Sequence, residues 1–402
     1  MPNSNSRYAY RGSRRPYARA NNANRSKRKN SGRGQYINPE LFVRVATSTT
    51  VEEYTPTHTF ADFALDERLQ KTIARKGYVV PTPIQDQAIP LGLQGLDVIG
   101  IANTGTGKTA AFALPVLSQI LTNRRTRALI VAPTRELAAQ IEAECHSISP
   151  ENGIKRALLI GGSPYGKQLF QLRQNPSIVI GTPGRIKDHI ERGTLRLSEF
   201  NIAVLDEVDR MLDMGFVDDV RLLLTKLSNE RQIFYFSATM DARVSGLIAT
   251  FSPDARTVTV KSGDTSDTVH QDVVRFQDKY DKQDKLHDIL IHADTEKVII
   301  FEETQRNVER LEIELKERGF EAISIHGGKS QGARSRALRS FKNNEVKILV
   351  ATDVAARGID VSDITHVVNY AQPQTYEDYV HRIGRTGRAG RIGHALTFIQ
   401  KH

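Results

Sequence analysis

The chain contains 402 residues, of which 39% are hydrophobic and 25% are charged, a composition typical of a soluble globular protein with two or three domains. It has no run of 18 apolar residues, so we expect no membrane-spanning segment. The single cysteine, Cys145, excludes an internal disulfide and a cysteine-rich metal site, and it is typical of a reducing compartment. We therefore expect a cytoplasmic protein.

The formal net charge of +10 is concentrated near the N-terminus. Residues 1–58 contain eleven Arg or Lys and three Glu, which gives +8 and leaves +2 for residues 59–402. Residues 1–37 are rich in Asn, Ser, Arg, Gly and Tyr with almost no aliphatic residues, and this predicts a disordered basic tail. A mitochondrial transit peptide is the alternative, but the segment shows no amphipathic period.

Residues 38–57 are expected to form a short linker or helix before the folded part begins. Leu41, Phe42 and Val45 share one face of a helical pattern. The sequence does not identify what that face packs against.

Short apolar runs alternate with amphipathic stretches from residue 58 onward. In one such stretch Val308, Leu311 and Leu315 lie on one helical face, Thr304 is placed to cap the helix, and Gly319 ends it. Strands separated by helices predict parallel sheets built from βαβ units. The expected strands are 97–101, 128–132, 178–181, 202–205 and 232–236, followed by 298–301, 322–325, 347–350, 364–369 and 395–399.

The two sets of strands predict two α/β domains, over residues 58–252 and 268–402. A polar segment with Ser-Pro and Ser-Gly-Asp sequences separates them and predicts an interdomain linker at 253–267.

A glycine-rich motif follows the apolar run 98–101 and opens a helical pattern, which is the context of a P-loop. Its backbone amides and the helix N-terminus favour phosphate, Lys108 is expected to reach the β- and γ-phosphates, and Thr109 is expected to ligate Mg²⁺. Ala102 stands where the usual first glycine would be, so an ordinary Gly-rich turn is the alternative. The predicted nucleotide-binding residues here are Thr104, Gly105, Thr106, Gly107, Lys108 and Thr109.

Three acids follow the apolar strand predicted at 202–205, an arrangement typical of a Walker-B motif. Asp206 is expected to hold Mg²⁺ and Glu207 to polarise the attacking water. An acidic helix cap explains one acid after a strand, but it explains three beside a P-loop poorly.

From Phe60 to His402 the chain resembles the DEAD-box RNA helicases of superfamily 2, with Asp-Glu-Val-Asp at 206–209 in place of the name-giving tetrad. Residues 77–85 resemble the Q motif of that family, and Phe60 lies seventeen residues before Gly77. The resemblance implies two tandem RecA-like domains and an ATP-dependent RNA helicase. It also implies that Gln85 reads the adenine edge and that Phe60 packs on the base.

Further motifs follow in the order of that family. By resemblance, Ser237 and Thr239 couple hydrolysis to strand separation through Asp209, together with His381, while Asp360 touches the ribose. Arg385 and Arg388 are expected to be arginine fingers that complete a catalytic set with Lys108, Asp206 and Glu207. The residues expected to contact the RNA backbone are Pro133, Thr134, Arg135, Gly162, Thr182, Pro183, Gly184, Arg185, Gln331, Arg334, Thr352, Arg357 and Gly358.

The expected ligands are therefore ATP, Mg²⁺ and RNA, the last bound without sequence preference by a monomer, and the basic tail is expected to add RNA affinity through Arg and Tyr. Three other functions stay open. They are a DNA helicase of the same superfamily, an ATP-dependent RNA clamp or annealing chaperone, and an RNA-binding protein with an inactive motor.

Overall fold

The computed structural model describes residues 38–46, 54–103, 105–150, 154–260, 268–292, 294–356, 361, 363–387 and 391–401. The predicted tail, residues 1–37, lies outside the described residues, as does the part 261–267 of the predicted linker. Within the described part of the chain, no helix is long and apolar enough to span a bilayer.

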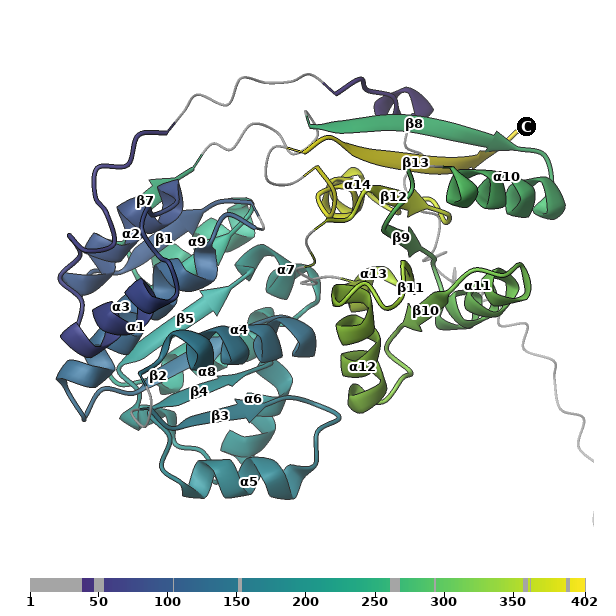
Figure 1. Cartoon of the computed structure of the whole chain (residues 1–402). Coiled ribbons are helices and arrows are strands. Elements are labelled where there is room, and N and C mark those ends of the chain that lie inside the picture. The colour runs from purple at the N-terminus through teal and green to yellow at the C-terminus, as the bar shows by residue number, and fades with distance from the viewer. Residues whose placement is uncertain are drawn as a thin grey trace, which may run out of the picture. The chain divides into compact units, whose positions relative to one another are not determined.

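The first domain is built on a seven-stranded sheet in the order β3-β4-β2-β5-β6-β1-β7, in which every neighbouring pair is parallel (Figure 1). Parallel strands cannot be joined by a tight hairpin and need crossover connections, which are mostly helices here. The strands are β1 (Val98–Ile101), β2 (Ala128–Val131), β3 (Arg156–Leu159), β4 (Ile178–Gly181), β5 (Ile202–Asp206), β6 (Gln232–Ser237) and β7 (Arg256–Thr259).

Helices cover both faces of this sheet, because its strands carry apolar side chains on both sides. In β2, for example, Ile130 packs into one core and Leu129 into the other. One face is covered by α1 (Glu67–Arg75), α2 (Pro83–Leu93), α3 (Lys108–Thr122) and α4 (Arg135–Ile148), and the other by α5 (Tyr165–Arg173), α6 (Pro183–Glu191), η2 (Leu197–Glu199), α7 (Val208–Asp213), α8 (Val217–Lys226) and α9 (Ala242–Phe251).

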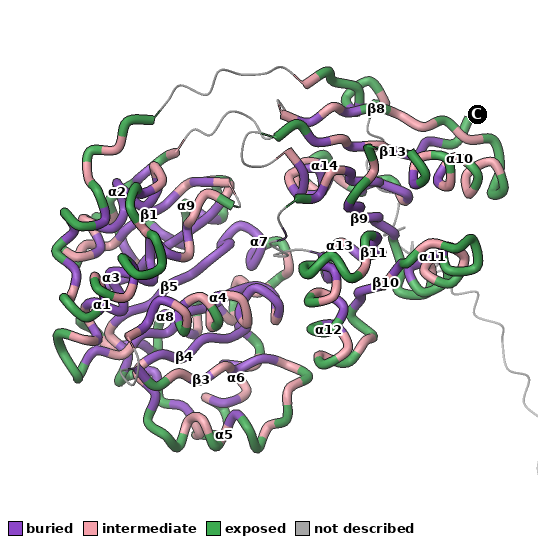
Figure 2. The backbone as a smooth tube through the Cα atoms, in the orientation of Figure 1, coloured by how far each residue is buried: buried purple, intermediate pink, exposed green. Residues whose placement is uncertain are grey.

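The second domain repeats the plan with a six-stranded parallel sheet in the order β10-β11-β9-β12-β13-β8. Figure 2 shows that the central strands of both sheets are deeply buried, whereas the edge strand β8 is largely half-buried or exposed. The strands are β8 (Val269–Phe276), β9 (Val298–Phe301), β10 (Ala322–Ile325), β11 (Ile348–Ala351), β12 (His366–Asn369) and β13 (Gly393–Gln400). The helices are α10 (Lys279–Ile291) and α11 (Gln305–Glu317) on one face, and α12 (Gln331–Lys342), α13 (Asp353–Ala356) and α14 (Tyr376–Ile383) on the other.

Local helix signals are confirmed at α11. The Thr304 side chain accepts a hydrogen bond from the backbone N–H of Asn307 at 3.2 Å, and Gly319 follows the helix with a φ of 89°. Val308, Leu311 and Leu315 are buried together, as their spacing predicts. The fold class, two parallel-sheet α/β domains, is likewise confirmed.

One expected boundary is wrong, and for another segment the structure decides against one of the two predicted alternatives. Residues 256–259, placed in the linker, form β7 and pair in parallel with β1, so the first sheet extends beyond residue 252. Residues 38–46 do not form an amphipathic helix, because only Pro39–Phe42 is helical, as the 3₁₀ turn η1. Phe42 is buried, whereas Leu41 and Val45 are 52% and 72% exposed. The predicted apolar face therefore consists of Phe42 alone.

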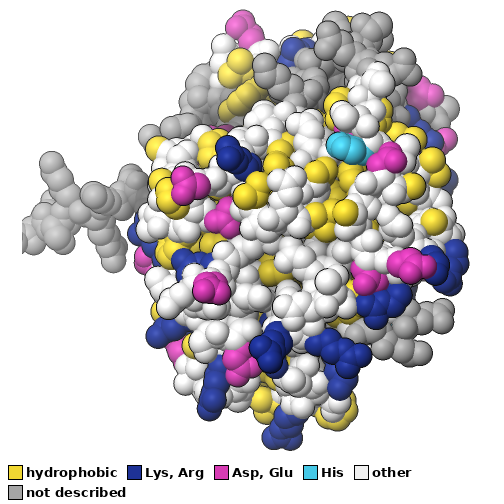
Figure 3. Space-filling view, turned by 90° about the vertical axis from the view of Figure 1, so that its left-hand side faces the viewer, with side chains coloured by type: hydrophobic (Ala, Val, Ile, Leu, Met, Phe, Trp, Pro, Cys, Tyr) yellow, Lys and Arg dark blue, Asp and Glu magenta, His cyan; other side chains and the backbone are white. Residues whose placement is uncertain are grey.

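Charges of both signs are mixed on the described surface. On the face that Figure 3 shows, Lys and Arg side chains lie among Asp and Glu and form no single-sign field. This distribution agrees with the net charge of +2 for residues 59–402.

Three histidines form a ladder across neighbouring strands of the second sheet. His394 in β13 lies between His366 in β12 and His270 in β8, with ring centroids 4.7 Å and 5.4 Å apart. Burial, together with a smaller contribution from the neighbouring His394, lowers the pKa of His366 to about 4. The pKa of His394 is also lowered, first by burial and then by His270.

We expect this ladder to make the second domain less stable in mild acid. Below a pH of about 6.5 the unfolded chain protonates His366 and His394, whereas their lowered pKa values favour the neutral forms in the folded chain, so the free energy of unfolding falls as the pH drops from about 6.5 to about 4. The loss for His366 alone reaches roughly 3 kcal/mol. Urea titrations across this pH range measure the free energy of unfolding, and His366→Phe should make that free energy depend less steeply on pH.

Candidate nucleotide and nucleic-acid sites

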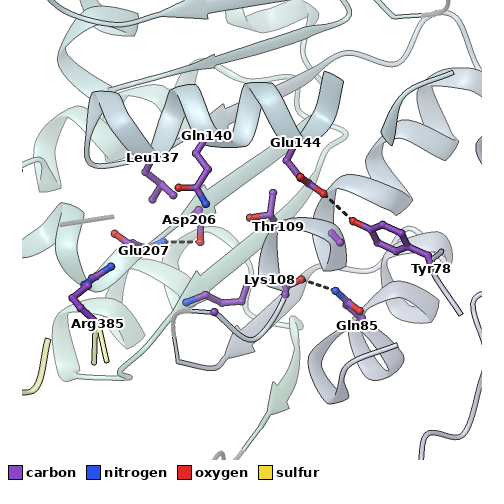
Figure 4. A pocket seen from close by; sticks show the side chains of 13 residues that line it. Tyr78, Gln85, Lys108, Thr109, Leu137, Gln140, Glu144, Asp206, Glu207 and Arg385 are labelled. Atoms are coloured by element: carbon purple, nitrogen blue, oxygen red, sulfur yellow. Dashed lines mark hydrogen bonds between the residues drawn. The ribbon is translucent and has the colours of Figure 1, made fainter. Parts of the chain in front are cut away.

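The predicted phosphate loop and acidic motif meet at one edge of the first sheet. The loop follows β1, Asp206 ends β5, and Ser237 ends β6, and these three strands are neighbours in the order β5-β6-β1. The carboxyl ends of parallel strands lie at the same edge, where ligands bind in open α/β sheets. A cavity of about 290 Å³ opens there, lined by Tyr78, Gln85, Gly105, Gly107, Lys108, Thr109, Ala110, Leu137, Gln140, Glu144, Asp206, Glu207 and Arg385 (Figure 4).

The loop conformation depends on glycine. Gly105 and Gly107 have φ values of 84° and 88°, which other residues rarely adopt. A Cβ on Gly107 would also lie 2.4 Å from Nε2 of Gln85, which donates to the Gly107 carbonyl at 3.1 Å. The Gln85 Oε1 accepts from the N–H of Thr82 at 2.9 Å, so the predicted adenine reader ties α2 to the loop. Thr106 lies in the same turn, and Thr104 lies outside the described residues.

A buried amine and a buried carboxyl face the cavity together. Lys108 is 7% exposed, and its Nζ donates to the Ala102 carbonyl at 2.9 Å. Asp206 is 3% exposed, and burial raises its pKa to about 6 although the charge of Lys108 opposes the rise. Cationic groups brought to this site, such as Mg²⁺, would stabilise the ionised carboxylate.

The backbone at Glu207 is strained. Its φ is 55°, in the left-handed region, directly before α7. This conformation is uncommon for a residue with a side chain, and such strain clusters at functional sites. The Glu207 carboxylate pairs with Arg210 at 3.1 Å, and both side chains are buried. The ion pair and the strained turn hold the carboxylate in one orientation.

The donor set fits magnesium bound together with phosphate. Thr109 offers a hydroxyl and Asp206 a carboxylate, and Mg²⁺ is usually held by one or two such groups together with substrate oxygens and water. Across the ranges that the structure describes, no cluster of three or more His, Cys, Asp or Glu is able to hold a metal ion by itself. A magnesium ion here would therefore need oxygens from the nucleotide.

The aromatic side chain that lines the cavity is Tyr78, and Phe60 lies behind it. Phe60 is 4% exposed and its ring meets that of Tyr78 edge-on at 5.1 Å. The Tyr78 hydroxyl donates to Glu144 at 2.9 Å, which fixes the ring at the cavity wall (Figure 4). Tyr78 lines the cavity in this structure, whereas Phe60 contacts it only through the Tyr78 ring, and the packing of Phe60 on the base stays a prediction.

Arg385 from the second domain lines the same cavity and lies at its Glu207 end in Figure 4. It follows α14, which is locked to the second sheet by Arg382. The Arg382 guanidinium pairs with Asp353 through two bonds of 2.6 Å and 2.7 Å and donates to the Ala371 carbonyl at 2.6 Å. His381 lies on the same helix and lines a small crevice with Arg385. The other predicted finger and the predicted ribose contact lie outside the described residues, and these are Arg388 and Asp360.

The predicted coupling contact is present. Asp209 accepts hydrogen bonds from the backbone N–H groups of Ala238 and Thr239 at 3.0 Å and 2.9 Å, and from the Thr239 hydroxyl at 3.0 Å. The Asp209 N–H donates to the Ser237 hydroxyl at 3.3 Å. These bonds lower the pKa of Asp209 although burial alone would raise it. They join the acidic motif to the end of β6.

A second cavity, of about 490 Å³, gathers most of the residues expected to contact RNA. Thr134 caps α4, and Thr182 precedes α6, which begins at Pro183. Gly162 has a φ of 76°, and a Cβ there would lie 2.6 Å from the Arg135 guanidinium. The cavity is lined by Pro133, Thr134, Arg135, Glu136, Gly161, Thr182, Gly184, Arg185, Asp188, Met214, Phe216, Gly327, Arg334 and Val354.

Glu136 connects this cavity to the second domain. Its carboxylate pairs with Arg334 at 2.6 Å and accepts from the Gln331 side chain at 3.3 Å. Gln331 Oε1 and Arg334 Nε are buried without a hydrogen-bond partner. A phosphate oxygen can accept from Arg334 Nε, and a ribose hydroxyl can donate to Gln331 Oε1. Thr352 is nearly buried at the start of α13, and the remaining predicted contacts, Arg357 and Gly358, lie outside the described residues.

Comparison with known proteins identifies the family to which the chain belongs. Residues 82–246 match the DEAD/DEAH box helicase family, and residues 281–390 match the helicase conserved C-terminal domain. The ATP-dependent RNA helicase CshA of Limosilactobacillus reuteri is 45% identical over 342 residues, which are 85% of this chain and 69% of that protein. The chain belongs to the DEAD-box helicase family.

Two further comparisons support this assignment. The DEAD-box ATP-dependent RNA helicase CshA of Bacillus subtilis (strain 168) is 46% identical over 347 residues, covering 85% of this chain and 70% of that protein. The structure of S. cerevisiae Dbp5 bound to RNA and ADP BeF3 is similar with a TM-score of 0.75 and 32% identity, covering 86% of this chain and 90% of that chain. Nearly a third of each CshA protein lies outside the matched region.

Several residues of this DEAD-box site were not predicted from the sequence. They are Tyr78, Arg210, Arg382 and Asp353, and Glu136 in its pairing with Arg334. Tyr78, Arg210 and Glu136 each contact a predicted residue, whereas Arg382 and Asp353 pair with each other. Each of these residues lies in or beside a recognised motif, and this position was the signal that could have identified it. The spacing of the motifs does not predict which residue each one contacts.

Proposed function

We propose that the protein is an ATP-dependent RNA helicase that couples ATP binding and hydrolysis to local separation of RNA duplexes or to remodelling of RNA–protein complexes. The observation that carries this function is the cavity in which Lys108, Asp206 and Glu207 of the first domain meet Arg385 of the second. A site divided between two domains is complete only when they come together, so nucleotide binding and domain closure are linked.

Each side chain of the cavity has a role in phosphoryl transfer to water. Lys108 neutralises the β- and γ-phosphates, and Arg385 neutralises charge that develops on the γ-phosphate. Thr109 and Asp206 would hold Mg²⁺, which supplies further charge neutralisation. Glu207, held by Arg210 at 3.1 Å, accepts the proton of the attacking water. Phosphate release removes the contacts that favour closure.

The cavity around Arg135 and Arg334 supports binding of an RNA backbone without sequence preference. Backbone amides at Gly161 and Gly162, the N-termini of α4 and α6, and guanidinium groups recognise phosphates and not base edges. The Glu136 pair with Arg334 places this cavity across both domains, so RNA and ATP favour the same closed arrangement.

Several finer statements belong to this proposal. We infer that the enzyme uses Mg²⁺, acts as a monomer in the cytoplasm, and gains RNA affinity from residues 1–37. The basis for the last statement is the charge, since ten of the Arg and Lys residues lie in that segment together with four Tyr.

A duplex-release assay with a labelled RNA strand tests the proposal. We expect ATP hydrolysis stimulated by RNA more than by DNA, with release of the strand, and Lys108→Ala should lower both to background because the phosphate contact is lost. The exposed Lys226→Ala is the matched control and should behave like the unchanged protein. Hydrolysis without strand release would indicate a clamp or annealing chaperone, stimulation by DNA alone would indicate a DNA helicase, and RNA binding without hydrolysis would indicate an inactive motor.

A further inference from the structure

Residues 38–46 precede the first domain in the sequence but dock on the second (Figure 1). Phe42 is 1% exposed and belongs to the hydrophobic core formed with β8 and α14. Arg44 and Gln271 exchange two backbone hydrogen bonds, of 2.9 Å and 2.8 Å, as an antiparallel bridge on the edge strand β8. The N–H of Ala46 donates to His270 Nδ1 at 3.2 Å. A buried aromatic ring and a short strand-like contact thus hold this segment.

The same chain is anchored on the first domain only eight residues later. The Tyr54 hydroxyl donates to Asp86 at 2.6 Å, and the backbone N–H groups of Thr57 and His58 donate to the same carboxylate at 2.8 Å and 3.1 Å. Asp86 is 2% exposed and follows Gln85 in α2. The His58 ring Nδ1 also lies 2.7 Å from this carboxylate, and a buried carboxylate with four such partners is a strong attachment, because breaking it would leave a charge without partners.

The two domains are therefore joined by two short connections. Ala46 and Tyr54 are eight Cα steps apart, as are Val260 after β7 and Thr268 before β8, and eight steps span at most roughly 29 Å. On the second domain both connections end at the start of β8, at His270 and Thr268. On the first domain they end on α2 and β7, which contact each other.

We propose that residues 38–46 and 54–58, which we call the strap, tie the two domains together beside the interdomain linker, and that Phe42 is the anchor of the strap and a positioning residue for α14. Two domains joined by a single connection can twist about it, whereas two connections attached side by side resist twisting. Domain closure then starts from fewer open arrangements and loses less conformational freedom. Ligands that bind only the closed arrangement therefore bind more tightly.

The anchor also reaches the helix that presents Arg385. The ring of Phe42 lies 4.6 Å from that of Tyr379 in α14, centroid to centroid. The Tyr379 hydroxyl donates to Gln271 at 2.9 Å, and Gln271 is the residue whose backbone pairs with Arg44. Because α14 ends at Ile383, two residues before Arg385, the strap supports this side of the nucleotide cavity.

The decisive experiment cuts the strap and leaves its contacts in the protein. Residues 47–53 are exchanged for a seven-residue recognition sequence of a site-specific protease, so the length is kept and the uncut protein is the matched control. Labels on Lys226→Cys and Glu317→Cys report the distance between the domains without requiring any activity. Cys145 is fully buried, and burial raises the pKa of its thiol to about 12, so it does not compete for the labels.

Cutting is expected to broaden the distance distribution in the absence of ligands. The proposed function adds a second readout, since KM for RNA in the ATPase assay should rise roughly threefold or more while kcat is kept, because no group of the cavity is lost. An unchanged distance distribution after complete cutting would overturn the strap whatever the activity. A broadened distribution without RNA-stimulated hydrolysis would support the strap and contradict the proposed function.

Substitutions at the anchor separate docking from chain continuity. Phe42→Ala should broaden the distances as cutting does, Phe42→Leu should restore them, and Leu41→Ala should have no effect because Leu41 is exposed in the same turn. Circular dichroism shows whether Phe42→Ala keeps its fold. If that variant unfolds, the cut protein still tests whether the strap restricts the interdomain distances, because the cut protein retains Phe42. A folded Phe42→Ala variant with unchanged distances would contradict the assignment of Phe42 as the anchor.

Discussion

Replacing Arg385 with Ala is expected to lower the ATP turnover number by about 10³- to 10⁵-fold, the range found when an arginine finger is lost. The guanidinium enters the cavity from the second domain, on the side of Glu207, where charge develops on the γ-phosphate. ATP binding should change little, because Lys108 and the loop amides remain. The loss should therefore appear in kcat more than in the affinity for ATP.

The measurement is steady-state hydrolysis at saturating RNA, with nucleotide binding followed separately by fluorescence. Arg385→Lys keeps the charge but not the planar fork and should recover only part of the rate. Arg391→Ala is the matched control, since Arg391 is 73% exposed and pairs with Asp363 on the surface. Turnover close to that of the unchanged protein for Arg385→Ala would refute a site shared by the two domains.

The second large effect is expected for Glu207→Gln, which keeps the shape of the side chain and removes the base. Loss of a positioned general base typically costs about 10²- to 10⁴-fold in rate. Glutamine still accepts from Arg210, so the strained turn before α7 should persist. ATP and RNA should then hold the protein closed, because the step that ends this state is blocked.

Release of labelled RNA after a chase with unlabelled RNA measures the trapped complex. We expect release to be slower than from the unchanged protein with ATP, and equally fast for both with ADP. Glu230→Gln, at an exposed position of the same domain, should release RNA normally. Equal release rates with ATP for Glu207→Gln and the unchanged protein would show that Glu207 is not the hydrolytic residue.

Much of the fold could be predicted because its signals are local. The ten strands expected from apolar runs are present within two residues at each end, and α11 begins and ends where Thr304 and Gly319 place it. The strands that escaped prediction, β3, β7 and β8, contain partly exposed residues and polar side chains. They join the sheets through backbone pairing with neighbours, which composition does not reveal.

The sequence by itself determined the chemistry at the ends of β1, β5 and β6. A P-loop needs glycines and Lys108 in consecutive positions, and Asp206, Glu207 and Asp209 follow one strand, so short-range order specifies these groups. Parallel strands then bring the segments together at one edge of the sheet, as βαβ order requires.

Only the tertiary structure decided which distant residues support that chemistry. Glu136 meets Arg334 across 198 positions of sequence, Arg44 meets Gln271 across more than 220, and the Tyr78 ring that lines the cavity packs against Phe60. Such contacts have no periodicity to read, because they depend on how separate elements pack and not on the order of residues within any one of them. For the same reason the helical pattern of residues 38–46 did not predict that Phe42 is buried while Leu41 and Val45 are exposed. The burial of Phe42 depends on its packing against the core of the second domain.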